Sequence, residues 1–183
     1  MSATDKVLLY SGELGVCYGQ FYVVAATADE WTDMNAAFAG QSNGLCGGGQ
    51  PGRLFFVTGT HTGKVQLTVE FTATRPEVEP TWEEQVECSF EVKAGPIHLR
   101  DWEGLLSHVL QLSPRSYRVR YSARGMLADW EVEPSPTKLQ SYLVQFWPEP
   151  PRPDEIVRAQ GECAKYWHAE VAKSGGGTDT SDA

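Results

Sequence analysis

The chain of 183 residues is long enough for one domain with a real core, and its 41% hydrophobic and 21% charged residues are typical of a globular protein. Its formal net charge of −9 argues against nonspecific binding to DNA, RNA or anionic lipid, because all of these carry the same sign. A basic partner fits this charge, and so does solubility alone.

The sequence contains neither a secretory signal nor a membrane-spanning stretch. Near the N-terminus the apolar run covers only residues 7–10, and no segment approaches the about 18 apolar residues of a spanning helix. We therefore expect a cytoplasmic protein. The cysteines are far apart and form no Cys-x-x-Cys pair, so we expect neither a zinc site nor disulfides. They are Cys17, Cys46, Cys88 and Cys163.

The first elements in the chain are predicted to be a buried strand and a helix. "GVCYGQFYVVAA" (15–26) is apolar on both sides, which is typical of a strand covered on both faces. A short helix is expected near 28–39, because Thr27 followed by Glu30 matches a capping box. Gly40 then fits the end of this helix.

A glycine-rich loop and a series of strands follow. The loop "QSNGLCGGGQPG" (41–52) has five glycines in twelve residues, and "RLFFVTG" (53–59) is a further buried strand. Three segments alternate between apolar and polar residues, so each is predicted to bury one face and to expose the other. These are "KVQLTVEFTA" (64–73), "QVECSFEV" (85–92) and "SYRVRYS" (116–122).

The remaining segments complete a mainly β fold. "PIHLRDW" (96–102), "HVLQLS" (108–113) and "SYLVQFWP" (141–148) are further strands. We predict an antiparallel β-sandwich of about eight strands, since one-sided strands joined by short turns favour this class. A C-terminal helix is expected near 153–173, with Pro153 in its first turn. Residues 1–174 would form a single domain and 175–183 a disordered tail.

The glycine-rich loop 41–52 is the first candidate for chemistry. Cys46 could be an exposed nucleophile there, and backbone N–H groups could hold an anion. The four histidines are scattered, and none is near Cys46 in sequence. We interpret the segment as an exposed, flexible loop with an incidental cysteine. "GTHTGKV" (59–65) lacks the spacing of a phosphate loop and is predicted to be a hairpin turn.

Carboxylates and tryptophans recur together. Asp-Trp-Glu occurs at 101–103 and again at 129–131, and Trp82 precedes two glutamates. Glu87 and Glu91 fall on a predicted solvent face, where carboxylates need no catalytic explanation. Strand alternation alone can place a tryptophan inward and its acidic neighbours outward. The functional interpretation is an acidic interface with aromatic anchors, because tryptophan is enriched among binding hot spots.

This interface hypothesis gives a set of candidate residues. We predict that one tryptophan of the two motifs is in the core and that Trp102, near a strand end before Gly104, is exposed. Negative charge at such a surface would speed the approach of a basic partner. The candidate partner-binding residues are Asp101, Trp102, Glu103, Asp129, Trp130, Glu131, Glu83 and Glu84.

Three segments together resemble the competence protein J family. They are "ELGVCYGQFYVV" (13–24), "EEQVECSFEVKAGPIHLRDWEG" (83–104) and "LQLSPRSYRVRY" (110–121), so the resemblance covers about residues 13–124. Cys17 stands where the family has serine, and Ser116 where it has glycine. The matching residues are Tyr18, Gln20, Phe21, Val23, Gly95, Ile97, Leu99, Pro114, Tyr117 and Val119. The resemblance implies a β-sandwich protein that inhibits a DNA-degrading nuclease linked to DNA uptake.

The two lines of argument favour a non-enzymatic, acidic binding protein. We expect a basic protein partner such as a nuclease, no catalytic residues, no cofactor, no metal, and no direct binding of nucleic acid or membrane. Nuclease clefts are basic because they hold phosphates, so an acidic protein can occupy them. The alternatives are a small enzyme or ligand-binding module centred on the loop 41–52, and a scaffold subunit of a larger assembly.

Overall fold

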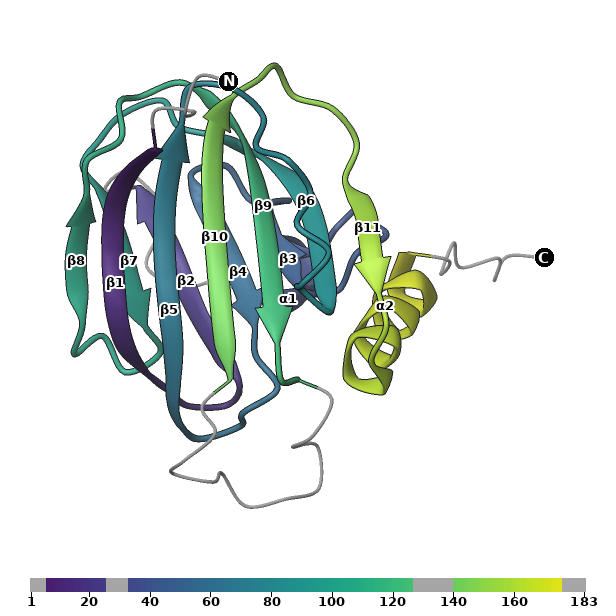
Figure 1. The fold of residues 1–183 in the computed structure, drawn as a ribbon. Coiled ribbons are helices and arrows are strands. Elements are labelled where there is room, and N and C mark those ends of the chain that lie inside the picture. Colours follow the sequence, from purple (N-terminus) through teal and green to yellow (C-terminus); the bar gives the residue numbers. More distant parts are fainter. Residues whose placement is uncertain (1–5, 26–32, 127–139, 176–183) are drawn as a thin grey trace.

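The computed structural model describes residues 6–25, 33–126 and 140–175. Two β-sheets lie face to face, with a helix beside one edge (Figure 1). The elements are β1 (Lys6–Val16), β2 (Gln20–Ala25), α1 (Met34–Ala37), β3 (Cys46–Gly47), β4 (Arg53–Val57), β5 (Gly63–Thr72), β6 (Glu84–Glu91), β7 (Ile97–Asp101), β8 (Ser107–Leu110), β9 (Ser116–Arg124), β10 (Ser141–Pro148), β11 (Glu155–Ala159) and α2 (Glu162–Gly175).

The sheets confirm the predicted mainly β sandwich. One sheet has six strands in the order β1-β5-β10-β9-β6-β11, and the other has five in the order β3-β4-β2-β7-β8. Neighbouring strands run antiparallel, with the exception of β5 and β10, which pair in parallel. The connection from β5 to β10 includes other strands of both sheets, and such a crossover is what a parallel pair needs.

The core lies between the sheets, where the alternating strands meet. Val65, Leu67 and Val69 on β5 are fully buried, as their period of two predicts. From the other sheet, Phe21 stacks on Phe56 with ring centroids 4.6 Å apart. Burying each such side chain contributes about 1.5–3 kcal/mol to folding. These contacts fix both sheets and hence the connections at their ends.

Residues 15–26 differ from the prediction of one continuous strand. β1 ends at Val16 and β2 begins at Gln20, so a tight turn separates two antiparallel strands of different sheets. Tyr18 and Gly19 both have positive φ in this turn. The apolar composition of the segment hid the turn, because Gly19 is the only conventional turn residue between Val16 and Gln20.

The two helices are shorter than predicted. In the described part of 28–39, α1 is a single turn whose N-cap is Asp33, and Thr27 and Glu30 lie outside the described residues. The predicted helix 153–173 is wrong in its first part, because Glu155–Ala159 forms the edge strand β11. β11 pairs with β6, so the sheet satisfies the backbone there before α2 begins at Glu162. The predicted tail 175–183 lies almost wholly outside the described residues.

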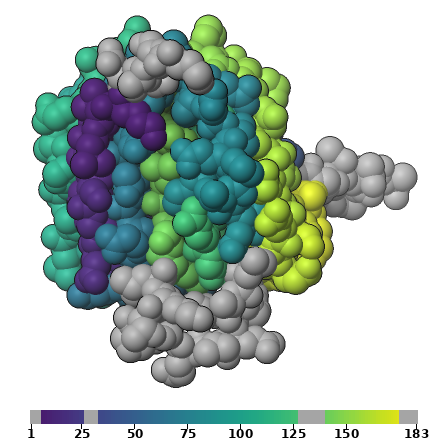
Figure 2. All heavy atoms as spheres, in the orientation of Figure 1, coloured from purple at the N-terminus to yellow at the C-terminus, as the bar shows by residue number. Residues whose placement is uncertain are grey.

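Two chain segments cover the outer face of the six-stranded sheet. One is the β5–β6 connection, and the other leads from β10 to β11. In Figure 2, blue-green atoms of the former lie in the middle of the visible face, between β1 and the C-terminal elements. No helix in the described residues is long and apolar enough to cross a membrane.

Candidate protein-binding site

Tyr18 occupies the tip of the hairpin between β1 and β2. Cys17 and Gln20 form an antiparallel bridge, so only Tyr18 and Gly19 lie in the turn. Their φ angles of 55° and 65° fit a type I′ turn, which requires positive φ at both positions. Glycine adopts this conformation freely, whereas a tyrosine there carries a strain of about 1–2 kcal/mol. The Tyr18 side chain projects outward and is 59% exposed.

Two other rings pack against Tyr18. Trp102, directly after β7, has its ring centroid 4.8 Å from that of Tyr18, and His61 in the β4–β5 connection packs edge-on at 5.4 Å. The backbone fixes this approach, because Gly19 N donates to His61 O at 2.7 Å. Trp102 remains 37% exposed, which confirms that it lies at the surface. We call Tyr18, His61 and Trp102 the aromatic cluster.

Carboxylates flank the aromatic cluster. Asp101 ends β7 and is partly buried, while Glu103 is exposed. A shallow pocket of about 270 Å³ separates Trp102 and these two acids from Lys64 and the end of β1. Lys64 Nζ donates to Glu13 Oε2 at 2.8 Å, so its charge is already paired. Asp101 Oδ1 is buried and has no hydrogen-bond partner among the described residues.

Three connections bring these residues together at one end of the sandwich. The β1–β2 turn, the β4–β5 connection and the β7–β8 connection all lie at the lower end of the molecule in Figure 1. Of the predicted binding residues, Asp101, Trp102 and Glu103 are therefore neighbours of Tyr18 and His61, which the sequence interpretation missed. The one signal for this turn was Gly19, since glycine at the second position of a two-residue loop is typical of a type I′ hairpin. The second motif, Asp129, Trp130 and Glu131, lies outside the described residues.

Glu83 and Glu84 both accept hydrogen bonds from the backbone of this chain. Glu84 is fully buried, and its carboxylate accepts from Gly161 N at 2.6 Å and Gln160 N at 3.0 Å. It thus holds the backbone just before α2, and burial raises the pKa of its carboxyl group. Glu83 is partly buried and accepts from Gly125 N at 2.7 Å. The expectation that Glu84 contacts a partner is wrong for this fold, because its side chain is not at the surface.

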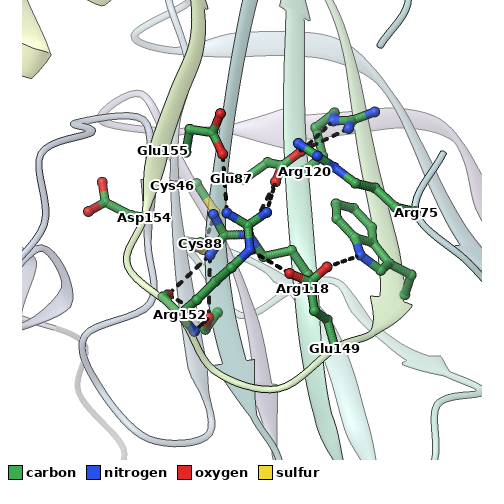
Figure 3. A network of polar contacts seen from close by, with 12 residues as sticks. Cys46, Arg75, Glu87, Cys88, Arg118, Arg120, Glu149, Arg152, Asp154 and Glu155 are labelled. Atoms are coloured by element: carbon green, nitrogen blue, oxygen red, sulfur yellow. Dashed lines mark hydrogen bonds and ion pairs between the residues drawn. The ribbon is translucent and has the colours of Figure 1, made fainter. Parts of the chain in front are cut away.

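Glu87 was predicted to face solvent, and it too is fully buried. Four guanidinium groups surround its carboxylate (Figure 3): Arg120 at 2.8 Å, Arg152 at 2.9 Å, Arg75 at 3.1 Å and Arg118 at 3.2 Å. Burial by itself raises the pKa of Glu87, but the hydrogen bonds and charges of these arginines outweigh it and lower the pKa. We call Glu87 and its four arginines the Glu87 network.

The Glu87 network fastens the two covering segments to the sheet. Arg120 Nη1 donates to Pro76 O and Glu77 O, both at 2.9 Å, which holds the β5–β6 connection. Arg118 Nη1 donates to Arg152 O at 3.2 Å, which holds the β10–β11 connection. The polar residues of β9 do point outward, as predicted, but the covering segments keep this face from solvent. The buried charges of the Glu87 network therefore have a structural role, which is to hold the two covering segments on the sheet.

The glycine-rich loop 41–52 is packed, and the expectation of an exposed, flexible loop is wrong. Cys46 is fully buried, and burial raises the pKa of its thiol. Gly44 lies against α2 so closely that a Cβ there would be 2.2 Å from Trp167 O. Glycines therefore serve close packing at this site, and Cys46 lacks the exposure of a reactive thiol.

The loop also uses its own polar groups internally. Asp154 accepts from Asn43 N at 2.7 Å and from Ser42 N at 2.9 Å, so the amides that could hold an anionic ligand are occupied. Gly44 N donates to His168 Nδ1 at 2.9 Å, and burial lowers the pKa of His168. Within residues 6–25, 33–126 and 140–175, no group of three or more His, Cys, Asp or Glu residues could hold a metal ion.

The fold and the site define a two-sheet β-sandwich protein with an exposed aromatic cluster beside two carboxylates. No protein family and no curated protein matches the sequence. Two solved structures share the fold. ComJ from Bacillus subtilis, described as an inhibitor of the DNA degrading activity of NucA, is 17% identical with a TM-score of 0.51 over 79% of this chain and 98% of ComJ.

The second structure is described as crocagin biosynthetic gene J. It is 14% identical, with a TM-score of 0.53 over 79% of this chain and 99% of its own. At these identities the similarity is one of fold, and this chain has a ComJ-like β-sandwich. The resemblance found in the sequence over residues 13–124 is confirmed at that level.

Proposed function

We propose that this protein is a non-enzymatic inhibitor that binds a basic, DNA-degrading nuclease through the aromatic cluster and its flanking carboxylates. The ComJ-like fold supports an inhibitor, since ComJ is described as one. Fold alone does not fix function, so the proposal depends on the site. The net charge of −9 supports a basic partner.

The observation that carries the proposal is the strained, exposed position of Tyr18. Non-glycine residues with positive φ persist where the surrounding structure holds them, and they gather at functional sites. Here the strain presents a large aromatic side chain to solvent, where burial offers no compensation. Trp102 packs against this ring with the centroids 4.8 Å apart, so the two aromatic side chains are already in contact before a partner arrives. Rigid Tyr and Trp side chains are the residues most enriched among binding hot spots.

The chemistry of the surface fits a basic side chain of the partner. The face of a tryptophan or tyrosine ring attracts a guanidinium or ammonium group placed over it. Asp101, which is partly exposed, and Glu103, which is exposed, lie beside these rings and add negative charge to the surface. An arginine or lysine that normally holds phosphate in a nuclease cleft could therefore be held by this surface instead.

The packed loop 41–52 supports the non-enzymatic part of the proposal. Its amides bind Asp154, and Cys46 is buried against the core. A ligand would have to displace an internal carboxylate that accepts backbone hydrogen bonds from Ser42 and Asn43. The surface at Tyr18 needs no such rearrangement.

The proposal is tested with nucleases from the cells that make this protein. Their extract is fractionated by cation exchange, and DNA degradation in each basic fraction is measured while purified protein is added. We expect one fraction to lose activity at a defined molar ratio, with a complex that elutes as one species. Undiminished DNA degradation in all fractions at a large excess of the protein would contradict the proposal.

A further inference from the structure

Two buried thiols from different sheets face each other in the core. Cys46 on β3 belongs to the five-stranded sheet, and Cys88 on β6 belongs to the six-stranded sheet. Their Sγ atoms are 3.2 Å apart, and both side chains are buried (Figure 3). A disulfide bond is about 2.0 Å long, so the sulfur atoms need to approach by only about 1.2 Å to form one.

The backbone around both cysteines holds them in this position. Cys46 pairs with Phe56 on β4, and its N–H donates to Asn43 Oδ1 at 2.8 Å. Cys88 pairs with Val119 in the middle of the β6–β9 ladder. Gly48 keeps the loop 41–52 against β6, because a Cβ there would lie 2.5 Å from Ser89 O. The pairing of the two thiols is thus built by strands and loop together.

We propose that Cys46 and Cys88 form a redox modification site, which closes to an inter-sheet disulfide in the presence of a small-molecule disulfide such as oxidised glutathione. This inference does not depend on the proposed function. Inter-sheet disulfides are a known way to join the two layers of a β-sandwich. Here the bond would join the packed loop 41–52 to the centre of β6.

The chemistry balances with glutathione as the oxidant. The thiolate of one cysteine attacks oxidised glutathione, which forms a mixed disulfide and releases one glutathione thiolate. The second cysteine loses its proton and attacks the protein sulfur of that mixed disulfide, which releases the second glutathione. Two protein thiols and one oxidised glutathione thus become one protein disulfide and two reduced glutathiones, and the two cysteine protons pass to the glutathione thiolates.

Burial makes the reaction slow in the closed protein. It raises the pKa of the Cys46 thiol and so reduces the thiolate fraction that can attack. It also keeps glutathione from the sulfur atoms. Oxidation therefore proceeds through local opening of the loop 41–52, and it should speed up in mild denaturant.

The experiment counts free thiols after equilibration with glutathione buffers. Protein is incubated in reduced or oxidised glutathione, both in plain buffer and in urea just below the unfolding transition. It is then acid-quenched, denatured and alkylated, and its mass is measured by mass spectrometry. We expect four alkylated thiols in the reduced protein and two in the oxidised protein, since the chain has four cysteines.

Peptide mapping identifies the pair. Cleavage after glutamate separates the cysteines, because Glu30 lies between Cys17 and Cys46, and Glu70 and Glu87 lie between Cys46 and Cys88. The expected cross-linked peptides contain Cys46 and Cys88. The Cys17→Ser variant should also lose two free thiols on oxidation, from three to one, whereas Cys88→Ala should alkylate at all three remaining thiols.

Two results of the thiol counting and peptide mapping would overturn the proposal. One is complete alkylation of the oxidised wild type even in the urea incubation, which would leave the 3.2 Å contact as a thiol–thiol hydrogen bond only. The other is a cross-link that involves Cys17 or Cys163. The oxidised protein should also unfold at a higher urea concentration than the reduced protein. A lower unfolding midpoint would contradict the claim that the native fold accommodates the bond.

Discussion

Tyr18 and Trp102 lie at the same end of the β2–β7 ladder, and their rings meet 4.8 Å apart at the surface. Tyr18 precedes β2, and Trp102 follows β7, which pairs antiparallel with β2. The register places Phe21 opposite Asp101, so the two aromatic residues emerge side by side from paired strands. Their contact is a direct result of sheet pairing and does not require a partner.

Because Tyr18 is strained, its replacement should affect stability and binding differently. Tyr18→Asn should keep the free energy of unfolding or raise it by up to about 1 kcal/mol, because asparagine tolerates positive φ. The same change should weaken inhibition of the nuclease, since the exposed ring is lost. Urea unfolding and inhibition titrations on the same preparations measure both effects. A Tyr18→Asn protein that inhibits as well as the wild type would exclude Tyr18 from the interface.

The carboxylates beside the aromatic cluster should act mainly on the rate of association. The double variant Asp101→Asn with Glu103→Gln should bind the nuclease more slowly at low salt, because fewer negative charges attract the basic partner. The difference should shrink as salt rises, since screening reaches about 8 Å near physiological ionic strength. Stopped-flow association over a salt series checks this. Equal rates for both proteins at every salt concentration would rule out a steering role.

Glu84 should matter for folding and not for binding. Glu84→Ala removes the acceptor for Gly161 N and Gln160 N, so the free energy of unfolding should fall by about 1–3 kcal/mol. Glu91→Ala on the same strand is the matched control, because Glu91 is exposed and its loss should cost less than about 0.5 kcal/mol. Inhibition by folded Glu84→Ala should equal that of the wild type. If Glu84→Ala inhibited more weakly while its stability stayed unchanged, Glu84 would be part of the binding interface.

The Glu87 network should make stability depend on acid pH. The pKa of Glu87 is lowered in the folded state, so its contribution is fully present above the unfolded pKa and is lost as pH falls through the folded value. Glu87→Gln should cost about 3–5 kcal/mol at neutral pH, because four arginines lose their shared anion. The cost should diminish as pH falls below the ordinary pKa of glutamate and through the lowered folded value, where the wild-type carboxylate also becomes neutral. Urea unfolding of both proteins at a series of pH values measures this. A difference in the free energy of unfolding that stayed constant with pH would contradict the predicted role of the Glu87 carboxylate.

The strand pattern was readable from the sequence because the core decides it. Residues such as Val65, Leu67 and Val69 alternate with polar neighbours, and their inward face follows directly from the period of two. Exposure of Trp102 was predictable from its place at a strand end before a glycine. These features depend on local order along one strand, which the sequence displays.

Other features depend on which segments meet, and the sequence does not display that. Glu87 is buried because the β5–β6 connection, with Arg75, and the β10–β11 connection, with Arg152, both pack over it. The glycine-rich loop is packed because α2 approaches Gly44. β11 is a strand because β6 offers an unpaired edge, which overrides the helical pattern of residues 155–159. Tertiary packing decides each case.

The most direct test of the proposed binding site compares two variants in one inhibition assay, one in the aromatic cluster and one on α2. Trp102→Ala should weaken inhibition of the nuclease by about 2 kcal/mol or more, roughly thirtyfold in the inhibition constant, while the protein stays folded. Tyr166→Ala is the control, because Tyr166 is 45% exposed on α2 and packs edge-on against Trp167, away from the aromatic cluster. We predict that Tyr166→Ala inhibits as the wild type does. Unchanged inhibition by folded Trp102→Ala, with or without an effect of Tyr166→Ala, would contradict the assignment of the binding site.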